Sequence, residues 1–270
     1  MIAGKSAIIS FMNFFSQIYQ HRELLLELVK REIKARYKQS ILGYAWVVLV
    51  PLINLGVLTI VFSFLLRIPT GDIPYPIFLF TALVPWTFTG NSISSATGSL
   101  VANSTLITKI YLPREIFPIA AVIAKMVDLV LSAVILVLFL IFFHVQLHIT
   151  LFWIPIIFLF QVLLVLGVSF ILSAMNVFFR DVENVLGVFL TVWMYLTPVI
   201  YPPEFIPGQF RPIFNLNPMM GVINAYRNVV LHGVSPPWQS FLYATLFSLG
   251  IFIVGYLFFK NRERFFADVI

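Results

Sequence analysis

The sequence predicts an all-α polytopic membrane protein with six transmembrane helices, an N-terminal cytoplasmic amphipathic helix and a re-entrant helix pair between spans 5 and 6. Composition is the first observation that predicts this class. Of the 270 residues, 60% are hydrophobic and only 10% are charged, and the mean hydropathy is +0.99. The second observation is that apolar residues form long uncharged runs, and roughly 20 such residues cross a bilayer core as a helix.

Residues 22–38 are predicted to form an amphipathic helix on the membrane surface. The apolar residues of this segment recur at three- and four-residue spacing, and its charged residues fall mostly on the opposite side. The apolar positions are Leu25, Leu26, Leu28, Val29, Ile33, Tyr37 and Ile41. A helix with a basic polar face suits the headgroup region of a bilayer. We therefore assign residues 1–40 to a cytoplasmic segment ahead of the first span.

The predicted transmembrane domain, residues 41–260, is followed by a cytoplasmic tail, residues 261–270. Its predicted spans are residues 41–66, 76–100, 118–143, 151–175, 185–201 and 241–259. Thirteen of the seventeen Lys and Arg residues fall on one side of these spans and three on the other. Because cytoplasmic loops carry the excess of basic residues, both termini are predicted to be cytoplasmic. Basic residues placed at the ends of spans explain the net charge without any nucleic acid.

The segment between Asn217 and Gly233 is predicted to be a short helix that does not cross the membrane. Asn217 suits the N-cap, Pro218 the first turn and Gly233 the C-terminal cap. The helix is short for a span and carries Arg227. A seventh crossing would also move the basic tail to the outer side. We therefore interpret this segment as a re-entrant or surface helix paired with the Pro-rich residues 202–212.

No catalytic motif or phosphate-binding loop occurs in the sequence, and cysteine is absent. His144 and His148 have the spacing of a metal pair but no third ligand nearby, so we expect no metal site and no cofactor in this chain. Asp181 and Glu183 form a close acidic pair, which keeps a membrane enzyme acting on polyprenyl lipids as a remote alternative. A gated channel is disfavoured because no polar ring repeats.

Two groups of residues within the spans are candidates for either packing or function. Lys125 and Asp128 lie three residues apart on one helix face, and we favour a structural pair over a conduction site. Gly90, Ser94 and Gly98 repeat every four residues, which favours close helix packing, within the subunit or across a dimer, over contact with substrate.

The predicted cytoplasmic loop from Ile107 to Phe117 mixes charged residues with large apolar ones. A plain connector would be polar, so exposed apolar residues here would need a partner surface. Lipid headgroups and a protein are both possible partners, and this composition slightly favours a protein.

Aromatic residues near the ends of the spans are a further set of candidates. They are Tyr44, Trp46, Trp193 and Tyr195. Amphipathic rings are typical of the interfacial belt, which is the favoured interpretation for each residue. Stacking on sugar rings along a glycan path is the alternative.

Several short motifs occur in a characteristic order along nearly the whole chain. They are Leu42-Gly43 followed by Trp46 and Pro51, Val84-Pro85-Trp86, residues 112–118 (LPREIFP), residues 176–181 (NVFFRD), residues 197–201 (TPVIY) and Asn217-Pro218-Met219. With the predicted topology, they resemble the permease subunits of ABC-2 type exporters. The resemblance is greatest to O-antigen polysaccharide export permeases, with capsule and teichoic-acid export permeases as relatives.

The resemblance implies a homodimer that joins two copies of a cytoplasmic ATP-binding-cassette subunit. ATP and Mg²⁺ would then be bound by that partner and not by this chain. The helix at residues 22–38 would be the family's interface helix. Coupling to the ATPase would fall on Lys109, Tyr111, Leu112, Pro113, Arg114 and Glu115.

The substrate implied by the resemblance is a glycan on polyprenyl pyrophosphate, exported across the bacterial inner membrane through an aromatic-lined canal. Candidates for that canal are Tyr44, Trp46, Trp193 and Tyr195, and candidates for an outer gate are Pro202, Asn217, Pro218 and Arg227. From their charge, we expect Lys34, Arg36, Lys38 and Arg180 to receive the pyrophosphate. Capsule, teichoic acid and smaller lipids or drugs stay open as alternative substrates.

Overall fold

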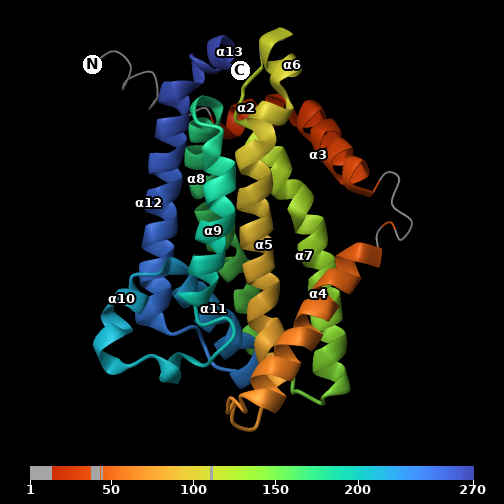
Figure 1. Cartoon of the computed structure of the whole chain (residues 1–270), viewed down its shortest axis with the longest axis vertical. Helices are drawn as coiled ribbons and strands as arrows, with labels where there is room; N and C mark the ends of the chain where they lie inside the picture. Colours follow the sequence, from red (N-terminus) through yellow and green to blue (C-terminus); the bar gives the residue numbers. More distant parts are fainter. Residues whose placement is uncertain (1–13, 38–42, 44, 110–111) are drawn as a thin grey trace.

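The computed structural model describes residues 14–37, 43, 45–109 and 112–270, which form helices and the loops between them. Its long helices run side by side (Figure 1). They are α4 (Ala45–Thr59) with its π-helical extension η1 (Ile60–Leu65), α5 (Tyr75–Ala102), α7 (Ile116–Phe142), α8 (Ile154–Phe178), α9 (Asp181–Tyr195) and α12 (Trp238–Glu263).

The short helices gather at the two ends of this bundle (Figure 1). One end carries α2 (Phe14–Gln20), α3 (Arg22–Tyr37), α6 (Ser104–Lys109) and α13 (Phe266–Val269). At the other end lie η2 (Ile149–Trp153), η3 (Pro203–Phe205), η4 (Gly208–Phe210), α10 (Arg211–Asn215), α11 (Pro218–Arg227) and η5 (Asn228–His232). The end with α6 and α13 is the one predicted to be cytoplasmic.

Within the described residues, four helical stretches are long and apolar enough to cross a membrane. They are Ala45–Leu65, Ile116–Phe142, Ile149–Phe178 and Trp238–Glu263. Of the other two predicted spans, α5 is 28 residues long but polar in its second half, and α9 has only 15 residues. The chain is thus a multi-pass membrane protein, and the full number of six spans stays a prediction.

The helix at predicted span 5, residues 185–201, has other bounds than the predicted span. Its helix begins at Asp181 and ends at Tyr195, and turns follow. Pro198 accounts for the early end, because a proline disfavours helical backbone at the residue before it. The boundaries of the other predicted spans differ from the observed helix ends by four residues or fewer.

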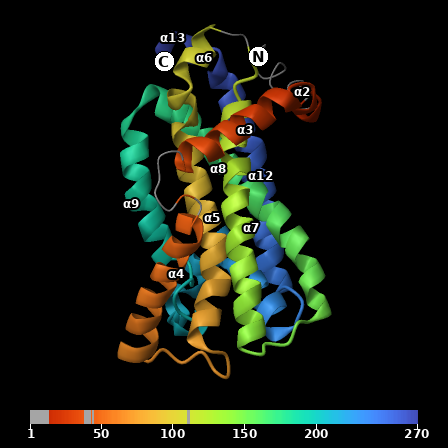
Figure 2. The ribbon, with the colours of Figure 1, turned by 90° about the vertical axis from the view of Figure 1, so that its right-hand side faces the viewer.

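The amphipathic helix α3 lies across the bundle and packs on α7 (Figure 2). Leu25, Leu28 and Val29 form its buried stripe, whereas Leu26 is 54% exposed. Leu26 is three residues before Val29 but about 100° around the helix from Leu25, so it lies at the edge of that stripe. The membrane-facing side of α3 stays a prediction.

The close contacts of α12 with α8 and α11 depend on glycine. A Cβ atom on Gly167 would lie 2.6 Å from the backbone of Ile251, and one on Gly221 would overlap the Ser240 carbonyl. Because glycine has no side chain, the two backbones approach closely and pack directly against each other. Together α8, α11 and α12 form a tightly packed unit on one side of α5.

The helix predicted between Asn217 and Gly233 is confirmed. The Asn217 side chain accepts a hydrogen bond from the Met219 backbone N–H at 3.1 Å, and Pro218 is the first helical residue. Gly233 ends η5 with a φ of +64°, in the left-handed region that suits glycine. Nearly every residue from Pro218 to Leu231 is buried, so α11 and η5 belong to the core of the subunit.

Candidate functional site

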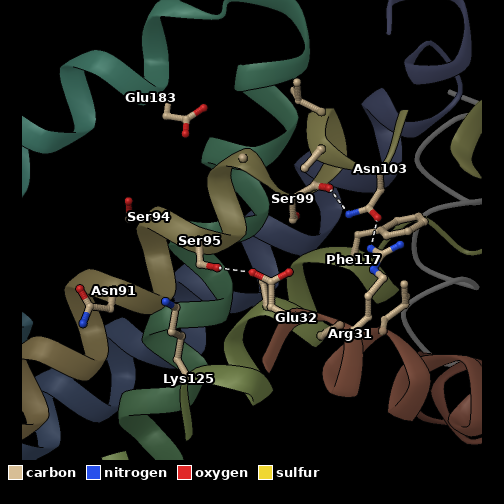
Figure 3. Close-up of a pocket in the computed structure, with 16 residues that line it drawn as sticks. Arg31, Glu32, Asn91, Ser94, Ser95, Ser99, Asn103, Phe117, Lys125 and Glu183 are labelled. Atoms are coloured by element: carbon tan, nitrogen blue, oxygen red, sulfur yellow. Dashed lines mark hydrogen bonds between the residues drawn. The ribbon is translucent and has the colours of Figure 1, made fainter. Parts of the chain in front are cut away.

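A line of polar and small residues along α5 faces a groove in the side of the bundle. They are Thr87, Asn91, Ser94, Ser95 and Gly98, which follow one another at three- and four-residue spacing or as neighbours and so share a helix face. The groove contains two adjoining pockets. The first, of about 460 Å³, lies between α3, α5, α7 and the start of α9 (Figure 3). That volume is within the range of small-ligand sites.

Charged side chains from three other helices line this first pocket (Figure 3). Arg31 of α3 donates a hydrogen bond to Asn103, and the Ser95 hydroxyl lies 3.3 Å from the Glu32 carboxylate. Lys125 enters from α7, and the Glu183 carboxylate of α9 lies beside Gly98.

The lining therefore balances two cations against two carboxylates among hydroxyls and amides. Such a surface suits a ligand rich in hydroxyl groups better than a strongly anionic ligand, because hydroxyls pair with both donors and acceptors.

The second pocket extends the groove along α4 toward the opposite end of the bundle. Asn91 and Lys125 line both pockets, and Asp128, Asn54 and Trp46 line the second pocket only. Lys125 and Asp128 thus both face the groove, and their interpretation as a structural pair stays a prediction.

The small-residue repeat on α5 does not pack another helix closely at its first two positions within the described subunit. A Cβ on Gly90 would meet no atom within 4 Å, and Ser94 is exposed in the groove. At the third position, Gly98 provides space for the Glu183 side chain. No described residue of the subunit therefore packs closely on Gly90, and packing across a dimer stays a prediction.

The four aromatic candidates are in different environments. Trp46 is 45% exposed and lines the groove. Trp193 instead packs edge-on against Trp86 at 5.6 Å and donates a hydrogen bond to Asn217 at 2.9 Å. Tyr195 is exposed at the end of α9, and Tyr44 lies outside the described residues.

The predicted coupling residues divide into an outward and an inward group. Lys109 is exposed at the end of α6, Leu112 and Pro113 are half-buried, and Tyr111 lies outside the described residues. The Arg114 guanidinium donates to the backbone carbonyl of Glu263, and Glu115 is fully buried. The latter two side chains therefore contact α12 of their own subunit.

Three of the large apolar residues expected to be exposed on this segment are instead buried. Ile107, Ile116 and Phe117 pack in a cluster with Leu28 of α3 and Phe259 of α12. At these three positions the segment folds back on the helix ends, which cover the side chains, whereas Leu112 is half-buried and Ile110 and Tyr111 lie outside the described residues. The exposed part is the polar face of α6.

Glu115 belongs to a cluster of charges at this end of the bundle. The Lys260 ammonium lies 2.8 Å from Glu115 Oε2 and 2.8 Å from Glu263 Oε2. Burial, together with the neighbouring Glu263 carboxylate, raises the pKa of Glu115 above its ordinary value of 4.5, and Lys260 opposes that rise.

The two basic candidates for the pyrophosphate that the structure describes, Lys34 and Arg180, are not among the residues that line the groove. Lys34 is exposed on α3, and Arg180 is exposed just before α9. The Arg36 side chain and all of Lys38 lie outside the described residues. Arg31, which sequence analysis did not single out, is a cation of α3 that lines the groove.

The predicted gate residues join α11 to the end of α9. Asn217 donates to the Leu196 carbonyl at 3.1 Å and to the Thr197 hydroxyl at 2.8 Å. Arg227 is 3% exposed and donates to the carbonyls of Pro198 and Val199 at 2.6 and 2.7 Å. The Arg227 guanidinium also lies over the Phe78 ring at 3.7 Å. Pro202 and Pro218 are buried.

Gln161 of α8 is a buried residue that sequence reasoning missed. Its amide donates to the Pro85 carbonyl at 2.7 Å and to the Thr89 hydroxyl at 2.9 Å, and its carbonyl accepts from the Tyr226 hydroxyl at 2.9 Å. The signal was a lone amide side chain within an apolar span, which must find a partner inside the protein.

The fold and the groove define a class of protein: a multi-pass helical membrane protein with a polar groove along α5. The chain belongs to the ABC-2 type transporter family, whose pattern matches residues 23–231. The family is one of membrane transporters.

Several relatives align with nearly the whole chain. The O-antigen export system permease protein RfbA of Klebsiella pneumoniae is 31% identical over 250 residues, which are 92% of this chain and 95% of that protein. The protein of the same name from Myxococcus xanthus is 30% identical over 259 residues, 94% of this chain and 98% of that protein. The polysialic acid transport protein KpsM of Escherichia coli is 28% identical over 250 residues, which are 88% of this chain and 92% of that protein.

Proposed function

We propose that this chain is the permease subunit of an ATP-driven exporter that moves lipid-linked polysaccharide of the O-antigen type across the bacterial inner membrane. The observation that carries the proposal is the polar groove along α5, because a hydroxyl-rich polymer needs donors and acceptors along its path. The relatives named as O-antigen export permeases support the same substrate.

The groove is open on one side of the described subunit, and we propose that a second copy covers it. A polar surface facing lipid is costly because hydrocarbon offers no hydrogen bonds. The helices on either side of the groove, α4 and α9, expose apolar residues that suit such contact. They include Val50, Ile53 and Val57 of α4 and Val185, Val188 and Val192 of α9. Two grooves facing each other would form one canal.

Energy would enter from a separate ATP-hydrolysing subunit, present in two copies, that binds ATP and Mg²⁺. The sequence lacks a phosphate-binding loop, so uphill transport requires a partner. We place that partner at the end of the bundle with α3, α6 and α13. The distribution of basic residues supports a cytoplasmic location for this end and for both termini.

We retain two assignments of individual residues as parts of this proposal. Trp46 would contact the glycan in the groove, and Lys34 and Arg180 would meet the pyrophosphate at the cytoplasmic mouth. To these we add Arg31, because it lines the groove. The α11–η5 helix would be the returning arm of a re-entrant pair at the outer side. Capsule polysaccharide is the second candidate substrate, favoured by the likeness to KpsM.

Filling the groove tests the proposal. Ser94→Leu and Asn91→Leu place bulky apolar side chains on the polar face of α5. We expect surface polysaccharide to fall by about tenfold or more, because lost hydrogen-bond partners and blocked space both oppose passage, while polyprenyl-linked glycan accumulates inside. Gly250→Leu is the matched control, since a side chain at Gly250 meets nothing within 4 Å.

Normal export by both groove variants would contradict the path proposed along α5. Export lost in the Gly250 control as well would show that bulk anywhere in the bundle is harmful. Amounts of the subunit in the membrane and its association with the ATP-hydrolysing subunit should stay unchanged in all three variants.

A further inference from the structure

The segment that carries the predicted coupling residues lies beside the last turn of α12. We call residues 104–109 and 112–115 the coupling segment. The Arg114 backbone N–H donates to Glu263 Oε1 at 3.1 Å, and the Arg114 guanidinium donates to the Glu263 backbone carbonyl. The Lys260 ammonium bridges the carboxylates of Glu115 and Glu263 at 2.8 Å each.

This cluster of four charges is balanced and mostly withdrawn from water. Arg114 and Lys260 offset Glu115 and Glu263, and the Lys260 and Glu115 side chains are 10% and 0% exposed. Removing one partner of a buried pair is costly because it leaves the other charge unpaired away from water. The cluster therefore holds one geometry, unlike the Lys30–Glu27 pair, whose side chains are 60% and 70% exposed.

Beyond the cluster, α12 is in direct contact with the helices around it. Its backbone touches α8 at Gly255 and Gly167, and its first turn touches α11 at Ser240 and Gly221. Contacts between backbones leave little freedom for one helix to move without the other. The coupling segment is thus joined to α12, and α12 is joined to α11 at the opposite end of the bundle.

We propose that Arg114, Glu115, Lys260 and Glu263 form an ionic fastening that positions the coupling segment on α12. When the ATP-hydrolysing subunit moves the coupling segment, that movement is then transmitted to α12 and is not confined to α6 and the residues next to it. These four are positioning residues, and the inference rests on the proposed docking of the partner at the coupling segment.

Amide hydrogen exchange of the assembled transporter tests the fastening directly. The Arg114 amide is hydrogen-bonded to Glu263, so its exchange rate reports whether the cluster holds. In Lys260→Met we expect exchange at residues 112–117 to accelerate by about tenfold or more. Lys260→Arg keeps the charge and should restore most of the protection. Glu115→Gln leaves the Lys260–Glu263 pair intact and should give a smaller increase.

The exposed pair provides the matched control, because Glu27→Gln also breaks a lysine–glutamate contact. We expect exchange at residues 112–117 to be unchanged in this variant. Unchanged exchange in Lys260→Met would overturn the fastening, whatever the transport activity.

The second readout is polysaccharide exported per ATP hydrolysed. A lower ratio in Lys260→Met, recovered in Lys260→Arg, supports transmission through α12, because misfolding alone would lower both quantities together. Faster exchange with an unchanged ratio would overturn the transmission role. Failure of the unaltered chain to bind or stimulate any ATP-hydrolysing subunit would instead reject the proposed function, while the exchange result would still decide the fastening.

Discussion

Gly167 of α8 lies against Gly255 of α12 so closely that neither position has space for a side chain. A Cβ atom on Gly167 would be 2.6 Å from the carbonyl oxygen of Ile251, and one on Gly255 would overlap the Gly167 carbonyl. The obstacles are backbone atoms, which cannot turn aside as a side chain can. The two helices are thus joined at their backbones.

Gly255→Val should lower the thermal stability of the subunit strongly. Inserted side-chain atoms in a packed interior cost about 1–3 kcal/mol, and rigid neighbours on one side place this site at the upper end. Gly250→Val on the same helix is the control, because nothing lies within 4 Å of its Cβ position. Thermal midpoints in detergent measure both, and equal midpoints would contradict the backbone contact.

Arg227→Met should loosen the attachment of α11 to the end of α9. The variant loses two hydrogen bonds from a charged donor to the carbonyls of Pro198 and Val199. Hydrogen bonds to charged groups contribute about 1.5–3 kcal/mol each, so we expect a loss of at least about 3 kcal/mol. Thermal unfolding in detergent measures that loss.

Arg211→Met serves as the control for this prediction. Arg211 is exposed and donates to the Ile206 carbonyl at 3.3 Å. Since exposed hydrogen bonds exchange readily with water, we expect little change in its thermal midpoint. Similar losses of thermal stability in the two variants would mean that stability depends on the positive charge and not on the buried hydrogen bonds of Arg227.

Trp46 and Trp193 should respond differently to replacement by alanine. Trp46→Ala removes an exposed ring in the groove, so export should fall with the thermal midpoint unchanged. Trp193→Ala removes the contacts with Trp86 and Asn217 and should cost about 3–5 kcal/mol of stability. Export assays combined with thermal unfolding separate the two, and a stable Trp193→Ala subunit without export would place Trp193 on the path instead.

The stability of Lys260→Met should depend on pH. Burial and the Glu263 carboxylate raise the pKa of Glu115, and Lys260 opposes them. Without Lys260 that pKa rises further, so the folded variant binds more protons than the unfolded chain above pH 4.5. A state that binds more protons gains stability as the pH falls.

The stability deficit of Lys260→Met, about 3–5 kcal/mol at neutral pH, should therefore narrow toward acidic pH. Thermal midpoints of the variant and the unaltered protein, measured at several pH values in one detergent, check this. A gap that stays constant with pH would show that Glu115 is not left unpaired.

Sequence reasoning predicted local features of the chain well. The caps at Asn217 and Gly233 are where the sequence placed them, because a side-chain acceptor and a residue free to adopt positive φ act on their immediate neighbours. The long helices were predicted for a similar reason, because a run of apolar residues is also a local property of the sequence. Pro198 was present in the sequence as a helix-ending signal, yet the predicted fifth span extended across it.

Contacts between distant residues were not predictable in the same way. Glu115 and Lys260 are separated by 145 positions, and the family resemblance implied only that Glu115 belongs to the segment that couples to the ATPase. The polar face of α5 was interpreted as a packing motif for the same reason. Whether a small polar residue packs or lines a path depends on which helix lies opposite.

The sequence by itself determined that this chain is a helical membrane protein, because hydrophobicity and helix caps depend on composition and near neighbours. Only the tertiary structure decided which faces of those helices meet: the groove beside α5, the glycine contacts of α12 and the charge cluster at Lys260. Those relationships depend on how each helix is rotated about its axis, which is settled by the packing of all the helices together.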